Sequence, residues 1–396
     1  MNMNEQMKES EESILHTYNR FPVVFEKGQG CYLYDSEGKE YLDFAAGIAV
    51  NSLGYHYPGY DEALKDQIDK LMHISNLYYN EPIIEAGAKL VKASKMSKAF
   101  FTNSGTEAIE GALKAAKKYA YVRDGHADHE IIAMNHSFHG RSIGALSVTG
   151  TAHYREPFEP LMGGVKFADF NDLESVKAQI TDKTCAIITE VVQGEGGIYP
   201  AKKEFLEGLR RICDEKDIML IFDEIQCGMG RTGHYFAWQA YGVQPDIMTS
   251  AKALGCGVPV GAFVLNEKAA KASLEPGDHG TTYGGNPFVC AAVSKVFDIY
   301  ENDKIIEHVQ EMTPYLEQKL DEIVAKHECA ATRRGMGFMQ GIVIKGRPVG
   351  EVVKAALAKG LLVISAGSDV LRIVPPLVIT KEHIDKMAAI LDECME

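Results

Sequence analysis

The chain has 396 residues, of which 46% are hydrophobic and 24% are charged. This length and composition are typical of a folded protein with two domains and a core large enough to need no disulfide or metal staples. The formal net charge of −14 and the lack of any Lys/Arg block disfavour nucleic acid as a partner.

The N-terminal segment is polar and acidic, without the basic start and apolar core of a secretory signal. No apolar run is long enough to span a bilayer, so we expect a cytoplasmic protein with no membrane partner. The eight cysteines are scattered, with no C-x-x-C pair and no Cys/His spacing of the kind that zinc requires. We therefore expect reduced, mostly buried thiols and no metal site.

An antiparallel hairpin is expected near the N-terminus, where residues 30–34 and 41–44 flank a turn at 35–38. Further on, seven short apolar runs predict strands. These runs are 99–103, 130–135, 164–169, 185–192, 218–225, 246–251 and 261–266. Amphipathic helices are predicted between some of them, as at 107–124 and 203–217. The alternation favours an α/β fold with a mostly parallel seven-stranded sheet.

A long helical pattern begins after Asn286-Pro287, and helices with short strands, such as 341–344 and 371–374, follow to the end. We expect a large domain at residues 56–285. A small α/β domain would combine residues 1–55 with residues 286–396, which begin with a linking helix.

Residues 102–107 join the first strand of the sheet to an alanine-rich helix. Ser104 or Thr106 can serve there simply as a helix N-cap. The same geometry also directs free backbone N–H groups and hydroxyls toward an anion, and it would suit a phosphate. Two further loops, 135–141 and 193–197, follow strands in the same way.

Two ionisable residues stand at the ends of predicted strands. Asp223 follows the apolar run 218–222 and can be a solvated turn residue, or a carboxylate that keeps a cofactor's pyridine nitrogen protonated. Lys252 is the one charged residue of the segment 247–265. A lone lysine is usually a solvated surface residue. Burial, however, can lower a lysine pKa by up to about 3–5 units, and the neutral amine then attacks carbonyl groups.

The five strand-end segments would lie at one edge of a parallel sheet, where open α/β folds bind ligands. A competing motif, G-x-G-x-x-G at residues 228–233, is typical of dinucleotide binding. It does not leave a strand directly, and no clear helix start follows it. We therefore disfavour a dinucleotide site.

Five segments, in this order and spacing, resemble the class-III aminotransferases of fold type I. They are NSGTEA (103–108), FHGR (138–141), DEIQ (223–226), SAKALG (250–255) and GTTYGGNP (280–287). The resemblance extends over nearly the whole chain. It implies amino-group transfer between amino acids and 2-oxo acids, pyridoxal 5'-phosphate as the cofactor, and a homodimer with shared active sites.

The resemblance also implies roles for individual residues. Lys252 would bind the cofactor as an imine and act as general base, and Asp223 would contact the pyridine nitrogen. The other expected cofactor contacts are Ser104, Gly105 and Thr106 at the phosphate, Phe138 against the ring, Gln226 near the ring oxygen, and Thr282 from the partner subunit. The expected substrate contacts are Arg141 for the α-carboxylate, Thr281, Glu195 and Arg372.

We expect Glu195 and Arg372 to let one site accept two dissimilar substrates. With acetylornithine bound, Glu195 would neutralise Arg372. With glutamate or 2-oxoglutarate bound, Arg372 would swing free to bind the distal carboxylate.

The resemblance is greatest to the branch that transaminates N2-acetylornithine with 2-oxoglutarate, a step of arginine biosynthesis. The ornithine branch tends to carry a tyrosine where Gly47 stands, which favours an acylated donor here. Donors that stay open are succinylornithine, a carrier-protein-linked lysine derivative, ornithine and 4-aminobutyrate. Tyr55 departs from the family, where histidine is usual. A catalytically silent binding or scaffold protein is disfavoured because Lys252 and Asp223 are both present.

Overall fold

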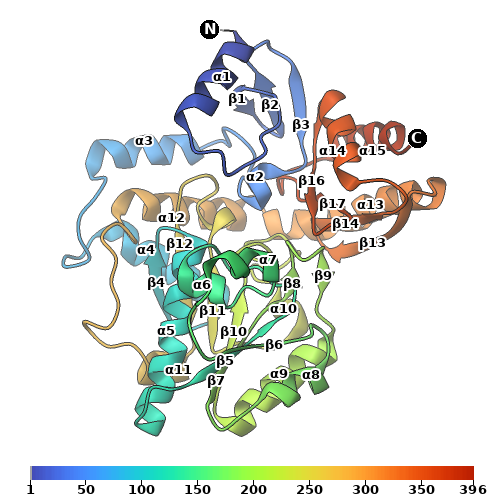
Figure 1. The fold of residues 1–396 in the computed structure, drawn as a ribbon. Helices are drawn as coiled ribbons and strands as arrows, with labels where there is room; N and C mark the ends of the chain where they lie inside the picture. The colour runs from blue at the N-terminus through green and yellow to red at the C-terminus, as the bar shows by residue number, and fades with distance from the viewer. Residues whose placement is uncertain (1) are drawn as a thin grey trace.

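The computed structural model describes residues 2–396 (Figure 1). Its central element is a seven-stranded sheet with the strand order β4-β12-β11-β10-β7-β5-β6. The strands are β4 (Lys98–Thr102), β5 (Glu130–Met134), β6 (Val165–Ala168), β7 (Thr184–Glu190), β10 (Met219–Asp223), β11 (Ile247–Ser250) and β12 (Gly261–Leu265). All seven predicted strands are confirmed. The sheet is parallel except for β12, which runs antiparallel to both β11 and β4.

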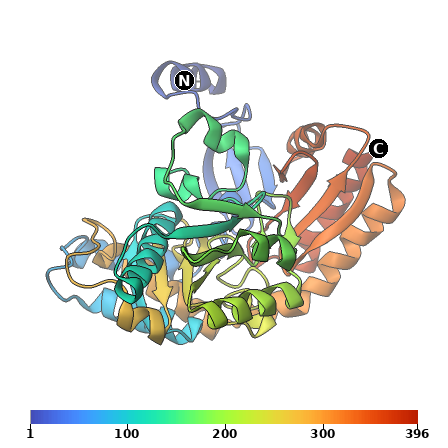
Figure 2. The same cartoon turned by 60° about the horizontal axis from the view of Figure 1, so that its bottom comes forward.

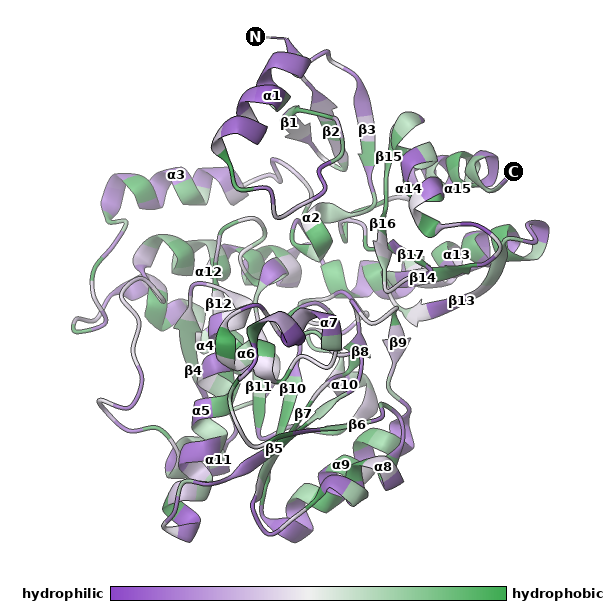
Figure 3. Ribbon diagram, viewed as in Figure 1, coloured by the Kyte–Doolittle hydropathy of each residue, from purple (hydrophilic) through white to green (hydrophobic). Residues whose placement is uncertain are grey.

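Alternate residues of the central strands enter two different cores. Ile187 of β7 and Leu220 of β10 belong to one buried cluster, whereas their neighbours Ile188 and Ile221 belong to the other. Every residue of these two strands is buried. Successive side chains of a strand point to opposite faces, so a continuous apolar run is what a sheet covered on both faces requires. Figure 3 shows the corresponding concentration of hydrophobic residues on the central strands.

Helices cover both faces of the sheet (Figure 2). On one face α5 (Gly105–Asp124) packs against β11 and β12, and on the opposite face α9 (Lys203–Lys216) packs against β7 and β10. Both confirm helices predicted from the sequence. Shorter helices of this part are α6 (Ile143–Ser147), α7 (Ala152–Arg155), α8 (Leu173–Gln179), α10 (Trp238–Tyr241) and α11 (Glu267–Ala272), and a small hairpin joins β8 (Val192–Gln193) to β9 (Tyr199–Pro200).

The N-terminal part contains the predicted hairpin, in which β2 (Tyr32–Asp35) pairs antiparallel with β3 (Glu40–Asp43). Strand β1 (Phe25–Gln29) extends this sheet on one side. On the other side β15 (Leu361–Leu362) pairs parallel with β3, so the two ends of the chain share a sheet. The first hundred residues also form the helices α1 (Met3–Ser13), α2 (Ala46–Ala49), α3 (Tyr60–Lys70) and α4 (Glu81–Ser94), of which α4 packs against β4 of the main sheet.

The C-terminal part begins with α12 (Pro287–Asn302), which packs against α3 and α4, and continues with α13 (Ile305–Lys326). A second four-stranded sheet follows, with the order β13-β14-β17-β16. Its strands are β13 (Ala330–Met336), β14 (Met339–Ile344), β16 (Ile364–Ala366) and β17 (Val370–Ile373), and α14 (Val349–Ala358) and α15 (Lys381–Met395) complete this part. The domain boundaries at residues 55 and 285 stay a prediction.

Two further properties bear on the sequence analysis. Within residues 2–396, no helix is both long and apolar enough to cross a membrane. All eight cysteines are free thiols, and seven of them are buried.

Candidate active site

Strands β4, β5, β7, β10 and β11 point the same way and end at one edge of the main sheet. Residues at or just beyond these five ends line one cavity of about 500 Å³. The predicted convergence is therefore confirmed for four of the five segments. The fifth, the loop 193–197, contributes Glu195 to a second cavity of about 790 Å³.

Eight of the twelve predicted site residues line the 500 Å³ cavity. They are Ser104, Gly105, Thr106, Phe138, Arg141, Asp223, Gln226 and Lys252. Glu195 and Arg372 pair with each other close by, as described below. Thr281 receives a hydrogen bond from Asn103 Nδ2 at 3.2 Å, whereas Thr282 is exposed.

Lys252 follows β11 with a backbone φ of +48°. A residue other than glycine in this left-handed region is uncommon and marks a place where the surrounding fold imposes the conformation. The turn directs the chain into a short 3-10 helix at Lys252–Leu254 and leaves Lys252 on the cavity wall. Burial lowers the pKa of Lys252, against the opposing charges of Glu195 and Asp223. A larger fraction of neutral amine makes Lys252 a better nucleophile.

Asp223 ends β10 and is 4% exposed. Its Oδ2 atom lies 2.7 Å from Nδ1 of the buried His139, and Oδ1 accepts from the Ile225 N–H at 3.0 Å and the Thr249 hydroxyl at 3.2 Å. The carboxylate is therefore held rigidly at the cavity. Sequence reasoning included His139 in a loop but assigned it no role.

Glu190 is a site residue that sequence reasoning missed. It ends β7, lies opposite Asp223 in the strand register, and lines the same cavity. Its carboxylate accepts the Gly194 N–H at 3.1 Å and the Phe138 N–H at 3.3 Å. Burial raises the pKa of Glu190 to about 7. An acid at the end of a buried strand is the signal that singled out Asp223. Glu190 did not show this signal, because it lies inside the predicted strand 185–192 and not at its end.

The start of α5 forms the end of the cavity that suits an anion. Ser104 Oγ accepts the Glu107 N–H at 3.3 Å, so Ser104 is the N-cap of the helix. The next N–H groups, of Gly105 and Thr106, are among those that a helix leaves without an internal partner. A Cβ atom on Gly105 would lie 2.9 Å from Ile225 Cδ1, so the glycine lets the helix start approach the Asp223 segment.

Arg141 and two aromatic rings form another wall. The Arg141 guanidinium carbon lies 3.9 Å from the centroid of the Tyr154 ring and 5.5 Å from that of Phe138. Such stacking fixes the plane of the guanidinium and leaves its N–H edge for a carboxylate.

Glu195 and Arg372 form a two-pronged ion pair, with Nη1–Oε1 at 2.5 Å and Nη2–Oε2 at 3.2 Å. Arg372 belongs to β17, is buried, and also donates to Gln226 Oε1 at 3.1 Å. Burial raises the pKa of Glu195, but the charge and hydrogen bonds of Arg372 outweigh this and hold it below its ordinary value. The pair therefore connects the second sheet to the cavity.

The G-x-G-x-x-G segment at 228–233 does not have the geometry of a dinucleotide loop. It begins five residues after β10 ends and leads to the four-residue helix α10. Its Arg231 is buried and donates to the carbonyls of Phe338 and Pro375. The segment therefore packs the C-terminal part against the sheet, in agreement with the sequence analysis.

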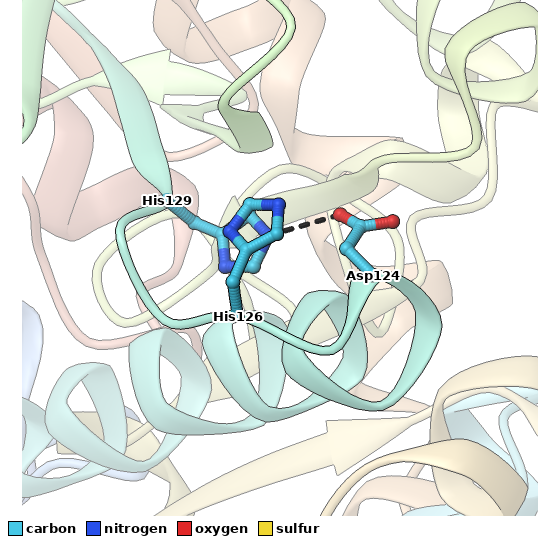
Figure 4. Close-up of side chains that lie close together, drawn as sticks. All are labelled: Asp124, His126 and His129. Carbon is cyan, nitrogen blue, oxygen red and sulfur yellow. Dashed lines mark hydrogen bonds and ion pairs between the residues drawn. The ribbon is translucent and has the colours of Figure 1, made fainter.

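Asp124, His126 and His129 gather at the end of α5 and could present three ligand atoms to a metal ion (Figure 4). Both Asp124 oxygens, however, already accept from Arg123, and Oδ2 lies 2.9 Å from His129 Nε2 as well. The guanidinium occupies the place of a cation. We therefore describe these residues as an ion-pair network that ends the helix.

Comparisons with known proteins agree with this geometry. The family model for class-III aminotransferases matches residues 14–395. An acetylornithine aminotransferase of Clostridium acetobutylicum is 47% identical over 98% of this chain and 100% of its own. A succinylornithine transaminase of Yersinia pseudotuberculosis is 44% identical over 94% of this chain and 92% of its own. A solved ornithine aminotransferase of Toxoplasma gondii, with PLP partly occupying its active site, superposes with a TM-score of 0.95 and 28% identity, covering 100% of this chain and 94% of that one.

Proposed function

This chain belongs to the class-III aminotransferases, and from that premise we propose that it transfers the amino group of N2-acetylornithine to 2-oxoglutarate with pyridoxal 5'-phosphate as cofactor. The products are N-acetylglutamate 5-semialdehyde and glutamate, and the step belongs to arginine biosynthesis. One observation carries the proposal: Lys252, Asp223 and the start of α5 surround a single cavity. The substrate follows from the 47% identity to an acetylornithine aminotransferase over the whole length of both chains.

The residues present fit pyridoxal 5'-phosphate. The unpaired N–H groups of α5 and the hydroxyls of Ser104 and Thr106 suit a phosphate, and the Asp223 carboxylate suits a protonated ring nitrogen. Phe138 offers a flat apolar surface, and Gln226 a polar contact for the ring oxygen. When bound, the cofactor supplies an electron-accepting ring that makes the hydrogen next to the substrate nitrogen acidic.

Lys252 and Asp223 have the chemical roles. Lys252 Nζ would hold the cofactor covalently when no substrate is bound, and its amine would be free once a donor amine occupies the site. The released amine then removes the proton from the donor carbon that bears the nitrogen, and it returns a proton in the reverse half-reaction. Asp223 would hold a proton on the ring nitrogen of the cofactor, and the hydrogen bonds of Asp223 with His139 and Thr249 keep its carboxylate in position.

The chemistry of the two amines indicates which carboxylate Arg372 binds. The reacting carbon of glutamate carries a carboxylate, whereas the reacting carbon of acetylornithine carries none. The Arg372 and Glu195 charges both act on Lys252, and Arg372 donates to Gln226 beside it. We therefore assign Arg372 to the carboxylate next to the reacting amine, instead of the distal one, and Arg141 to the carboxylate at the far end of either substrate.

The proposed enzyme is a homodimer in which Thr282 of each subunit completes the phosphate site of the other. The exposure of Thr282 in a single chain supports this, because the hydroxyl is available to a second subunit. Exposed apolar side chains nearby, among them Leu77, Tyr79 and Tyr283, offer a surface for such contact.

The test is to purify the protein with pyridoxal 5'-phosphate and follow its visible absorption during titration with single amino donors. We expect N2-acetylornithine to bleach the band at lower concentration than succinylornithine, ornithine or 4-aminobutyrate. Borohydride reduction should attach the cofactor to Lys252, as judged by peptide mass. A Lys252→Ala variant should lose the adduct, and Lys268→Ala, a matched change on α11, should keep it. A protein that forms no adduct at Lys252 would refute the proposal.

A further inference from the structure

A second cavity, of about 790 Å³, opens beside the active site. Its lining includes His153, Tyr154, Glu195 and the loop 365–369. The two cavities meet at Arg141, because this residue lines the first cavity while its guanidinium stacks on the Tyr154 ring that lines the second. A group attached close to a carboxylate on Arg141 therefore reaches the second cavity.

The proposed donor has such a group. In N2-acetylornithine the carboxylate and the acylated nitrogen share one carbon, and the reacting amine is at the other end. With that amine at Lys252 and the carboxylate at Arg141, the acyl group lies within a few bond lengths of Tyr154. Glutamate and 2-oxoglutarate carry no acyl group. The second cavity would therefore serve one half-reaction only, an inference that rests on the proposed function.

The charges on the wall of this cavity are mostly negative. Its acidic and histidine side chains are His136, His153, Asp169, Glu195 and Asp369. The charge of Glu195 is balanced by Arg372. Arg334 stacks on the ring of Tyr199, which also lines the cavity, with its guanidinium carbon 3.6 Å from the ring centroid. The two carboxylates of Asp169 and Asp369 outnumber this one cation, so the formal charge around the cavity is negative. Both of these aspartates are exposed to the cavity and to solvent.

We propose that the second cavity binds the N2-acyl group of the donor, and that Asp169 and Asp369 select a neutral acyl group against an anionic one. An acetyl group has no charge to be repelled. A succinyl group would bring a second carboxylate toward two others. The selectivity is then electrostatic and separate from the size of the cavity, which has room for either group.

The proposed selection by the charge of Asp169 and Asp369 is tested with the cofactor-loaded enzyme at pH 8 and low salt. The donors are N2-acetylornithine, N2-succinylornithine and N2-pentanoylornithine, the last being a neutral chain of similar length to succinyl. We expect the wild type to prefer the pentanoyl donor to the succinyl donor. Asp369→Asn should raise the succinyl-to-acetyl ratio of kcat/KM about threefold, and Asp369→Lys about tenfold. Both changes should shrink in about 0.5 M salt, which screens charge but not a structural defect.

Asp369 is the better position for this test because Asp169 Oδ1 also accepts a hydrogen bond from Asn135 at 2.6 Å. The matched control is Asp66→Lys, an exposed aspartate on α3, which lines neither cavity. A succinyl-to-acetyl ratio that stays within about twofold of the wild type in Asp369→Lys, or that rises equally in Asp66→Lys, would overturn the inference.

The location is tested by filling the cavity. Ser368→Trp should lower kcat/KM for the acetyl and pentanoyl donors by roughly tenfold and leave the glutamate half-reaction unchanged. Equal losses in both half-reactions would contradict the location. Wild-type enzyme that transfers nitrogen from other amines but not from acetylornithine would overturn the proposed function and this inference together. If the enzyme is active with acetylornithine but Asp369→Asn, Asp369→Lys and Ser368→Trp leave its donor preference unchanged, the inference alone would be overturned.

Discussion

At the scale of single residues, Glu195 neutralises the buried Arg372 when no substrate carboxylate is bound to this arginine. Replacing Glu195 by alanine leaves Arg372 without its ion-pair partner. We expect the glutamate half-reaction to be kept or improved, since its substrate supplies a carboxylate. The acetylornithine half-reaction should fall by about tenfold or more, because breaking a buried pair leaves an uncompensated charge.

Stopped-flow bleaching of the cofactor band by each donor measures the two half-reactions separately. The ratio of the two rates is the informative quantity, because a general folding defect lowers both. Equal loss in the two half-reactions would show that Glu195 does not act as a switch. Glu215→Ala, on the exposed side of α9, provides a control that should leave the ratio unchanged.

Glu224, next to the site, makes stability depend on pH. It is fully buried and accepts the N–H groups of Ala237 and Trp238 at 2.8 Å each. Burial raises its pKa from 4.5 to about 7. The folded state therefore holds the proton more tightly than the unfolded chain, and this stabilisation is lost as the pH rises from about 4.5 to about 7. The loss amounts to roughly 3 kcal/mol.

A Glu224→Gln variant cannot titrate, so its free energy of unfolding should fall less than that of the wild type between pH 5 and pH 8. Urea denaturation at several pH values gives the two slopes. The absolute stability of the variant is not the test. The side-chain NH2 group of the glutamine would face one of the two backbone N–H donors, and this clash changes stability at every pH. Glu215→Gln should retain the wild-type slope. Parallel wild-type and Glu224→Gln curves would contradict the buried titration.

Sequence analysis found Lys252 and Asp223 because each breaks an apolar run at the end of a strand. It could not find the hydrogen bond between Asp223 and His139, since these residues are 84 positions apart in the sequence. Only the packing of β5, β7 and β10 brings Asp223 Oδ2 to 2.7 Å from His139 Nδ1. Glu190 was missed for a different reason. The apolar run continues through Val191 and Val192, so the predicted strand extended past the residue that ends it.

At the scale of elements, Gly111 allows helix α5 to pack closely against the sheet. A Cβ atom on Gly111 would lie 2.2 Å from Cε1 of Phe263 in β12. Gly111→Ala should therefore destabilise the protein by about 1–3 kcal/mol, although alanine is the better helix former. In α4 a Cβ atom on Gly87 would meet only Phe101 Cε2, at 3.9 Å. Gly87→Ala should stabilise the protein by about 0.5–1 kcal/mol.

Chemical denaturation of the two variants measures these opposite effects, and each serves as the control of the other. Stabilisation by both substitutions would mean that α5 does not lie this close to β12. Because Gly111 is remote from Lys252 in sequence and lines neither cavity, any loss of activity should follow the loss of folded protein.

The strands were predictable as elements because their apolar runs are short, β-branched and bounded by turns. The direction of β12 was not assigned, although its connection carries a signal. Only residues 251–260 separate β11 from β12, and a parallel crossover needs a dozen residues or more, usually with a helix. The two-residue strand β15 has no such signal, since Leu361 and Leu362 form a strand only because β3 lies beside them.

At the scale of the whole molecule, shared active sites predict complementation between two defective subunits. Lys252→Ala lacks the reacting amine, and Thr282→Glu would place a negative charge at the phosphate of its partner. Each homodimer should be inactive. In a mixed dimer the site that contains Lys252 receives Thr282 from the other subunit and is intact. Refolding an equal mixture should restore about a quarter of the wild-type activity.

Activity of the refolded mixture, compared with each variant refolded alone, is the measurement. A matched mixture of Lys252→Ala with Asp223→Ala should stay inactive. Each change disables the cavity of the subunit that carries it, so a mixed dimer contains no intact site. Inactivity of the first mixture, in spite of mixed dimers seen by native mass spectrometry, would show that Thr282 does not cross between subunits.

The pairing of β15 with β3 also has a consequence for how the chain is made. Leu42 and Leu361 are register partners, yet a ribosome joins them about 320 residues apart. At about 5–20 residues per second, β3 emerges roughly 16–64 seconds before its neighbour exists. Throughout that interval the edge of β3 exposes unpaired N–H and C=O groups that any other strand could pair with. The segment that contains β3 is therefore one that a chaperone would protect during synthesis.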